Sequence, residues 1–113
     1  MLYIGIDGGG TKTKMTLFSE DGTKIKEVIK PSVHILTTKK EDCIHILKEG
    51  VDELDKDNHA QIIAGFAGYG QQIILRKQIE EICKKAFGNR EFSLYSDIEI
   101  AINGALNGKM VLL

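Results

Sequence analysis

The residues best suited to chemistry form one short run near the start of the chain, Asp7-Gly8-Gly9-Gly10-Thr11-Lys12. Three successive glycines let the backbone approach a ligand closely, and the amide groups of such a turn can surround an anion. An acid directly before a phosphate site would repel the phosphate unless a divalent cation lay between them, and Mg²⁺ binds carboxylate oxygens, phosphate oxygens and water together. The run therefore predicts a Mg²⁺ and phosphate site. Asp7 would serve the metal, the glycines and Thr11 the phosphate, and Lys12 would add a cation.

Spacing excludes the two best-known phosphate loops. A Walker A loop would need lysine directly after its last glycine, where this sequence has Thr11, and a dinucleotide-binding loop would need its third glycine where this sequence has Thr13. Both of those loops also lead into a helix, whereas a predicted strand follows here. The alternative without a ligand is a plain glycine-rich hairpin turn, but such turns seldom need three glycines after an acid.

The pattern of apolar residues predicts three strands in the first third of the chain. Residues 2–6 are a continuous apolar run typical of a central strand, and residues 12–18 alternate between two faces, which is the period of a strand. The turn signal Ser19-Glu20-Asp21-Gly22 separates them from a third strand over 23–30, which Pro31 closes. Strands joined by such short turns form an antiparallel meander.

Helical periodicity begins after these strands. The pattern predicts an amphipathic helix over 40–56, a strand over 60–66, a second helix over 75–86, a fifth strand over 91–95 and a third helix over 98–107. This order predicts an α/β fold: a mixed five-stranded sheet in the order 3-2-1-4-5, with its first three strands antiparallel and helices on its faces. That is the ribonuclease-H-like arrangement.

Composition excludes several classes of protein. The 113 residues carry 15 basic and 16 acidic side chains, which argues against a partner bound by phosphate neutralisation, as nucleic acid is. Cys43 and Cys83 lie on apolar helical stripes without metal-ligand spacing, so buried free thiols are expected. There is no signal peptide pattern and no apolar run of about 20 residues, so we expect a soluble cytoplasmic protein without a membrane partner.

The chain ends on a rising apolar run, Lys109-Met110-Val111-Leu112-Leu113, with no turn or polar residue after it. Full burial of each of these apolar side chains would be worth about 1.5–3 kcal/mol, and a strand that ends there has no obvious partner within the chain. We therefore expect residues 1–107 to form one lobe and residues 108–113 to begin a C-terminal lobe. The apolar end could also pair with a second copy in a homodimer.

The sequence around the glycines, residues 3–13, resembles the first phosphate motif of the superfamily of sugar kinases, actin and heat-shock chaperone ATPases. The triple glycine followed by Lys-Thr is most similar to the BadF/BadG-type ATPase family, which includes N-acetylglucosamine kinases. The resemblance covers all 113 residues and continues through Ser19-Glu20-Asp21-Gly22, Gly65-Phe66-Ala67-Gly68 and the segment from Asp97 to Ala105. It implies two lobes with ATP and Mg²⁺ in the cleft between them, and a small-molecule sugar as the second substrate.

The resemblance also implies roles for residues on the phosphate side. Asp7 would hold Mg²⁺ through water, and Gly9, Gly10 and Thr11 would contact the phosphates. The second phosphate motif of these proteins, a Gly-Thr-Gly loop, follows the strand that begins near Lys109, beyond the last residue of this sequence.

On the sugar side, Asp97 aligns with the acid that takes the proton from the sugar hydroxyl. By position alone, Asp97 is also an ordinary helix cap, because Ser96-Asp97-Ile98-Glu99 has the capping-box pattern. Gly68 and Tyr69 would lie at the cleft edge near the sugar or would simply form a tight strand-to-helix turn. Amino-sugar kinases place a sugar-binding Asn near Pro31-Ser32-Val33-His34, where this sequence has Val33 and His34. His34 would replace that Asn as a hydrogen-bonding residue, or would be an ordinary solvated loop histidine.

The expected function is therefore phosphorylation of N-acetylglucosamine or a related amino sugar, and three alternatives stay open. A ribonuclease-H-like nuclease also begins with an acid on its first strand, but needs further acids for two metals, and the segment Gly65-Phe66-Ala67-Gly68 supplies none. An activator ATPase of a dehydratase or reductase system would carry its Fe–S cysteines outside this chain. A non-catalytic ATP-binding regulator would use the same lobe.

Overall fold

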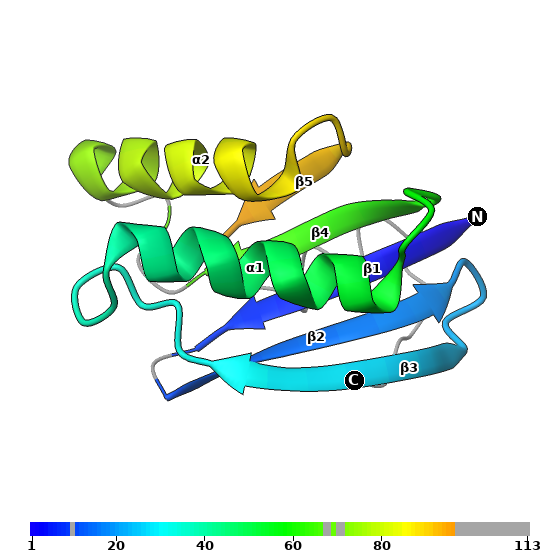
Figure 1. The fold of residues 1–113 in the computed structure, drawn as a ribbon. Coiled ribbons are helices and arrows are strands. Elements are labelled where there is room, and N and C mark those ends of the chain that lie inside the picture. The colour runs from blue at the N-terminus through cyan, green and yellow to red at the C-terminus, as the bar shows by residue number, and fades with distance from the viewer. Residues whose placement is uncertain (10, 67–68, 70–71, 97–113) are drawn as a thin grey trace.

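The computed structural model describes residues 1–9, 11–66, 69 and 72–96, and within them five strands and two helices follow one another (Figure 1). The strands are β1 (Leu2–Gly8), β2 (Lys12–Ser19), β3 (Lys24–Pro31), β4 (Ala60–Phe66) and β5 (Phe92–Tyr95), and the helices are α1 (Lys40–Leu54) and α2 (Ile73–Phe87). Each matches an element predicted from the sequence to within two residues at either end. The predicted helix over 98–107 and the strand from Lys109 lie outside the described residues.

The five strands form one mixed sheet in the order β3-β2-β1-β4-β5, which confirms the predicted topology. The pairs β1·β2 and β2·β3 are antiparallel, because short turns connect these strands. The pairs β1·β4 and β4·β5 are parallel, because longer connections containing α1 and α2 return the chain to the same end of the sheet. The fold is thus the ribonuclease-H-like mixed sheet that the element order predicted.

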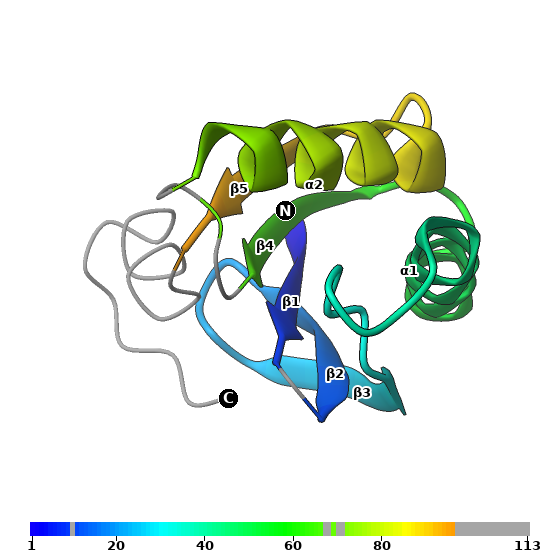
Figure 2. The same cartoon turned by 90° about the vertical axis from the view of Figure 1, so that its left-hand side faces the viewer.

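Both described helices pack on the same face of the sheet (Figures 1 and 2). Alternate side chains of the three central strands point to that face, among them Ile4, Ile6, Met15 and Ile62, each fully buried. They join the apolar stripes of the helices in one core, to which α1 contributes Cys43, Leu47, Val51 and Leu54 and α2 contributes Ile79, Ile82, Cys83, Ala86 and Phe87.

Both cysteines are free and buried, as the sequence predicted. Burial raises the pKa of the Cys83 thiol to about 12 and also raises that of Cys43. These thiols are therefore protonated core side chains and poor nucleophiles.

Four of the five strands end at the same edge of the sheet. Since β1, β3, β4 and β5 all run in one direction, their last residues, Gly8, Pro31, Phe66 and Tyr95, meet there. We call this side of the molecule the carboxyl edge. Open sheets with parallel strands bind ligands at such edges, and the predicted glycine run follows β1 at this point. Among the described residues, no helix is long and apolar enough to cross a membrane.

Candidate functional site at the carboxyl edge

Asp7 lies at the carboxyl edge with its side chain exposed, one residue before the end of β1. Its partners in the sheet register are Lys14 on β2 and Gly65 on β4, and Gly65 in turn lies opposite Tyr95 on β5. The four residues share the sheet face away from α1 and α2. Because Gly65 has no side chain, this row has no side chain between the carboxylate of Asp7 and the phenol of Tyr95.

Lys14 is a charged neighbour that the sequence analysis did not single out. Its side chain is only 31% exposed, and its Nζ atom lies 3.5 Å from Oε1 of Glu27 on β3. Burial raises the pKa of Glu27, but the Lys14 and Lys24 cations outweigh this and lower it overall, so Glu27 is a stable anion for Lys14. Within the described ranges, no basic nitrogen comes within 4 Å of Asp7. The signal that could have identified Lys14 from the sequence is the register of the β1–β2 hairpin, which places Lys14 on the same sheet face as Asp7.

The first two glycines after Asp7 both have structural roles: Gly8 is needed for packing, and the Gly9 backbone closes the turn. A Cβ atom on Gly8 would lie 2.4 Å from Cδ1 of the Phe66 ring, so that β1 and β4 could not end side by side with a larger residue there. The Gly9 amide donates to the Lys12 carbonyl over 3.2 Å and closes the turn. The close approach at Gly8 is therefore made by Phe66, and the Gly9 N–H is used inside the hairpin.

The next residues of the run reach solvent. Thr11 and Lys12 are both exposed, so their hydroxyl and ammonium groups are accessible at the carboxyl edge. Thr13 is fully buried, and its Oγ1 donates to the Pro31 carbonyl over 2.9 Å. This bond ties the base of the glycine turn to the end of β3. Gly10, also predicted to contact phosphate, lies outside the described residues.

The segment after β3, residues 32–39, packs against the glycine turn. The Ser32 hydroxyl donates to the Gly9 carbonyl over 3.3 Å and accepts the His34 amide over 3.1 Å. The His34 carbonyl in turn accepts the amides of Thr37 and Thr38. His34, a candidate sugar-binding residue from the sequence, is thus two hydrogen bonds away from the candidate phosphate turn.

The hydrogen bonds of His34 also fix which of its ring nitrogens carries the proton. Nδ1 accepts the Leu36 amide over 3.2 Å, so the neutral imidazole must be protonated on Nε2. The half-buried ring therefore offers a donor N–H on its other side. A group that binds there must supply an oxygen or nitrogen lone pair.

Tyr69, predicted at the edge of the sugar site, is 8% exposed. Its amide donates to the Phe66 carbonyl, and the Arg76 guanidinium lies over its ring, 5.2 Å from the ring centre. The exposed group beside Tyr69 is therefore the guanidinium of Arg76, near the start of α2. The Tyr69 ring stabilises it through a cation–π contact. Gly68 and Asp97, the other predicted sugar-site residues, lie outside the described residues.

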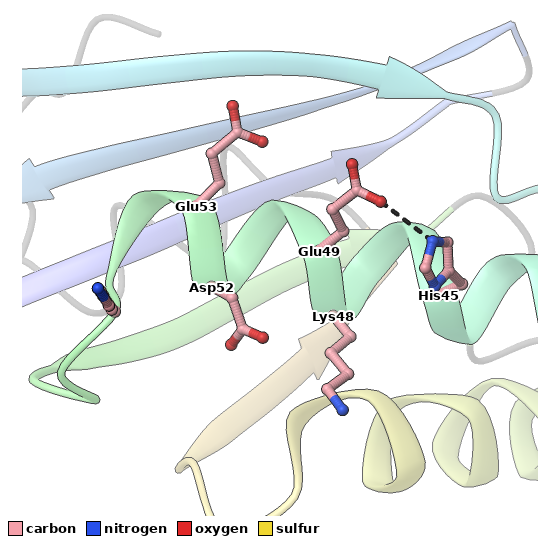
Figure 3. Close-up of a pocket in the computed structure, with 6 residues that line it drawn as sticks. His45, Lys48, Glu49, Asp52 and Glu53 are labelled. Atoms are coloured by element: carbon pink, nitrogen blue, oxygen red, sulfur yellow. Dashed lines mark ion pairs between the residues drawn. The ribbon is translucent and has the colours of Figure 1, made fainter.

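A separate hollow of about 750 Å³ runs along the outer face of α1 (Figure 3). Six residues line it, three acidic, two lysines and a histidine: His45, Lys48, Glu49, Asp52, Glu53 and Lys56. Glu49 and Glu53 point towards β3, where Lys30 pairs with both, and His45 pairs with Glu49. None of the predicted site residues contributes, so the hollow is a solvated, charged helix face.

The residues of the carboxyl edge can together bind a metal-bound polyanion and orient a hydroxyl compound beside it. Asp7 supplies the oxygen ligand that Mg²⁺ prefers, while Lys12 and Lys14, both on the neighbouring strand β2, supply positive charge beside it. No cluster of three or more His, Cys, Asp or Glu side chains that could hold a metal occurs in the described part of the chain. A magnesium ion here would therefore share Asp7 with ligand oxygens and water.

Comparison with solved structures identifies the fold. The inorganic polyphosphate/ATP-glucomannokinase of Arthrobacter sp. strain KM matches with a TM-score of 0.69 and 16% identity, over 96% of this chain and 50% of that one. A ROK hexokinase from Thermus thermophilus matches with a TM-score of 0.61 and 21% identity, over 96% of this chain and 39% of that one. RuvC from T. thermophilus, solved with a Holliday junction substrate, matches with a TM-score of 0.55 and 11% identity, over 100% and 83% of the two chains.

These likenesses establish the ribonuclease-H-like fold, and the chain spans half or less of the length of the two kinases. No family model and no curated protein sequence matches the chain. Since a junction-binding protein shares the fold with the sugar kinases, the choice of function rests on the site residues.

Proposed function

We propose that this chain is the N-terminal lobe of an ATP-dependent sugar kinase of the BadF/BadG type, acting on N-acetylglucosamine or a related amino sugar. The carrying observation is the position of Asp7 and the glycine turn. Asp7 and the glycine turn lie where the central strand β1 ends, at the carboxyl edge of the sheet. The fold of this chain is also the fold of the two sugar kinases described above. The balanced charge of the chain supports a small-molecule substrate over a nucleic acid.

On the phosphate side, Asp7 would hold Mg²⁺, and Gly10, Thr11 and Lys12 would contact the phosphates. Gly9 would let the phosphates come close because it has no side chain, since its N–H is already bonded to the Lys12 carbonyl. The residues present fit this ion, because Asp7 is an exposed carboxylate with no basic partner within 4 Å among the described residues. When bound, Mg²⁺ neutralises phosphate charge during transfer. Lys14, opposite Asp7 in the register, would add a second positive charge on the same sheet face.

On the acceptor side, His34 would donate its Nε2–H to an oxygen of the sugar, such as a hydroxyl or the acetamido carbonyl. Asp97, two residues after the end of β5, would accept the proton of the attacking hydroxyl. The hydroxyl oxygen would then bond to the γ-phosphorus as ADP leaves. Gly68 and Tyr69 would border the sugar, with Arg76 held over the Tyr69 ring as the charged group at that border.

The proposal extends to the whole protein. Residues 1–107 would form the lobe described above, and residues 108–113 would begin a second lobe that closes over ATP. We place the protein in the cytoplasm, because its two cysteines are free and buried. A homodimer through the apolar end of the chain is the proposed assembly, and light scattering that shows only monomers would argue against it.

The test is ATP consumption by the full-length protein, with and without sugar. We expect Mg²⁺-dependent ADP formation that requires N-acetylglucosamine and yields a phosphorylated sugar. ADP formation independent of sugar would instead support an activator ATPase. Nucleotide binding without turnover would support a regulator, and cleavage of branched DNA without ATP use would support a nuclease.

Asp97→Asn separates the catalytic role of Asp97 from its structural role. Asparagine caps a helix about as well as aspartate, so the melting temperature should barely change. Loss of a general base should lower turnover at least about 100-fold. Thermal melting and steady-state kinetics on the same preparation measure both effects, and a variant with near-normal turnover would remove Asp97 from the catalytic site.

Asp7→Asn tests the metal role. We expect the variant to bind Mg²⁺·ATP about tenfold or more weakly in calorimetric titration, because a neutral amide is a poorer magnesium ligand than a carboxylate. Affinity measured in EDTA should change little. Asp57→Asn, which removes an exposed carboxylate from the turn between α1 and β4, is the matched control and should bind normally. Equal losses with and without Mg²⁺ would contradict the metal assignment.

A further inference from the structure

Two segments of the carboxyl edge that are far apart in the sequence are connected by a single side-chain hydroxyl. The Ser32 Oγ atom donates to the carbonyl of Gly9 in the glycine turn and accepts the amide of His34 in the segment 32–39. The hydroxyl is therefore used in both directions, with one partner in each segment. Alanine at this position would remove the hydrogen bond to the Gly9 carbonyl and the hydrogen bond from the His34 amide.

Each segment is otherwise held by its own contacts. Segment 32–39 is closed by hydrogen bonds from Thr38 to the Ser32 carbonyl, over 3.0 Å, and from the Thr37 and Thr38 amides to the His34 carbonyl. It is anchored to α1, since the buried Cys43 thiol donates to the Val33 carbonyl. These contacts hold the segment against α1, whereas the amide of His34 is held by the Ser32 hydroxyl.

In the described part of the glycine turn, the restraints internal to the turn come from the backbone. Gly8 and Gly9 contribute no side chains, and the Gly9 amide bond to the Lys12 carbonyl closes the turn without fixing the Gly9 carbonyl. Glycine has the largest range of backbone conformations, so a peptide group here needs an external contact to keep one orientation. The Ser32 hydroxyl is the side-chain contact that the structure shows for the Gly9 carbonyl.

We infer that Ser32 is a positioning residue that couples the acceptor side of the site to its phosphate side, so that nucleotide and acceptor sugar bind with positive cooperativity. This inference rests on the proposed function. A nucleotide that orders the glycine turn fixes the Gly9 carbonyl, and through Ser32 it favours the arrangement of residues 32–34 in which His34 meets the sugar. By thermodynamic linkage, the sugar raises nucleotide affinity by the same factor.

The expected size follows from one hydrogen bond of ordinary strength, which corresponds to about 3- to 10-fold in affinity. The test measures the affinity of the full-length protein for N-acetylglucosamine, without nucleotide and with saturating Mg²⁺ and the β,γ-imido analogue of ATP. The ratio of the two dissociation constants is the coupling factor, and we expect about 3 to 10 for the unsubstituted protein. Glucose serves as a second acceptor probe.

Three variants separate coupling from a general structural role. Ser32→Ala should bring the coupling factor close to one. Ser32→Thr keeps the hydroxyl and should restore the coupling. Ser19→Ala removes a hydroxyl that is also hydrogen bonded, to Asp21, but in the turn at the opposite edge of the sheet, and should leave the coupling factor unchanged. Circular dichroism confirms that each variant is folded.

The outcomes distinguish this inference from the proposed function. If the unsubstituted protein binds both ligands with a coupling factor of one, or if Ser32→Ala keeps the normal factor, the inference is overturned and the kinase proposal stands. If the protein binds nucleotide but neither sugar, both the proposed sugar acceptor and the coupling through Ser32 are overturned. If the protein binds no nucleotide, the proposed function itself is overturned.

Discussion

At the scale of single residues, one buried ion pair stabilises the sheet edge opposite the site. Arg90, in the turn between α2 and β5, places Nη1 2.9 Å from Oδ2 of Asp55 and Nη2 2.6 Å from the Asp55 carbonyl. Oδ2 of Asp55 also accepts the Ala60 amide over 2.6 Å, at the first residue of β4. Asp55 is 6% exposed. The end of α1, the start of β4 and the start of β5 are thus joined at one carboxylate.

Asp55→Asn should lower the free energy of unfolding by about 2 kcal/mol at pH 7, because it removes the closer and more buried of the two carboxylates that pair with Arg90 and leaves only the exposed Asp52, at 3.3 Å. Burial raises the pKa of Asp55, but the amides of Ala60 and His59 and the Arg90 cation outweigh it and hold this pKa below the ordinary 3.8. A depressed folded-state pKa contributes stability above pH 3.8, which is lost as the pH falls through the lower folded value.

Urea unfolding at pH 7, 5, 4 and 3 checks this prediction. The difference between the unsubstituted protein and Asp55→Asn should be constant down to about pH 5 and should shrink below pH 4. Asp57→Asn, two residues along and exposed, should track the unsubstituted protein throughout. A difference that stays constant to pH 3 would show that the charge of Asp55 is not what stabilises this edge.

Residue types and spacing predicted Asp7 and the glycine turn, but they did not predict Lys14, Ser32 or Arg90. The signal for Asp7 is local, since an acid before three glycines is visible in a few letters. Lys14 becomes a neighbour of Asp7 only through the hairpin register, and Ser32 reaches Gly9 across 23 positions of sequence. A lysine in an alternating strand and a serine after a proline look alike whether or not they have such partners.

At the scale of elements, α1 approaches β2 closely at one glycine. A Cβ atom on Gly50 would lie 2.2 Å from Sδ and 2.8 Å from Cε of Met15, which is fully buried. Glycine within a helix ordinarily costs about 1 kcal/mol relative to alanine. The helix accepts that cost because its axis then lies near enough to the sheet for Cys43, Leu47 and Val51 to be buried.

Gly50→Ala should therefore destabilise the protein by about 1 kcal/mol, since overpacking against Met15 outweighs the gain in helix propensity. In a Met15→Ala background, where the obstructing side chain is gone, the same substitution should stabilise the protein. Chemical denaturation of the four proteins of this double-mutant cycle measures the reversal. A destabilisation of equal size in both backgrounds would place the cause elsewhere than in this contact.

Most element boundaries could be predicted, because hydrophobic period and turn residues are local properties. The helix predicted over 40–56 ends earlier, at Leu54. The backbone departs from helical geometry at Asp55, whose side chain accepts the Ala60 amide. The placement of both described helices on one face could not be read from the helices themselves. It follows from which alternate residues of β1 and β4 are large and apolar, and from the parallel register that aligns them.

At the scale of the whole molecule, the strand order was predictable because few topologies connect three meander strands to two strands that each follow a helix. The function was not predictable to the same depth, since the fold also occurs in RuvC. The proposed function therefore rests on the residues at the carboxyl edge. Asp7 and Lys14 face each other across one strand pair there, and segment 32–39 is tied to the turn that joins those strands.

The parallel pairing of β1 with β4 also has a consequence for how the protein is made. Leu2 pairs with Ala60, so β1 receives its second neighbour roughly sixty residues after it is synthesised. At about 5–20 residues per second, that interval is roughly 3–12 s. During it, β1 has one unpaired edge and carries apolar side chains such as Ile4 and Ile6 that α1 and α2 do not yet cover. The ribosome-bound intermediate is therefore the state of this protein most exposed to aggregation and most in need of a chaperone.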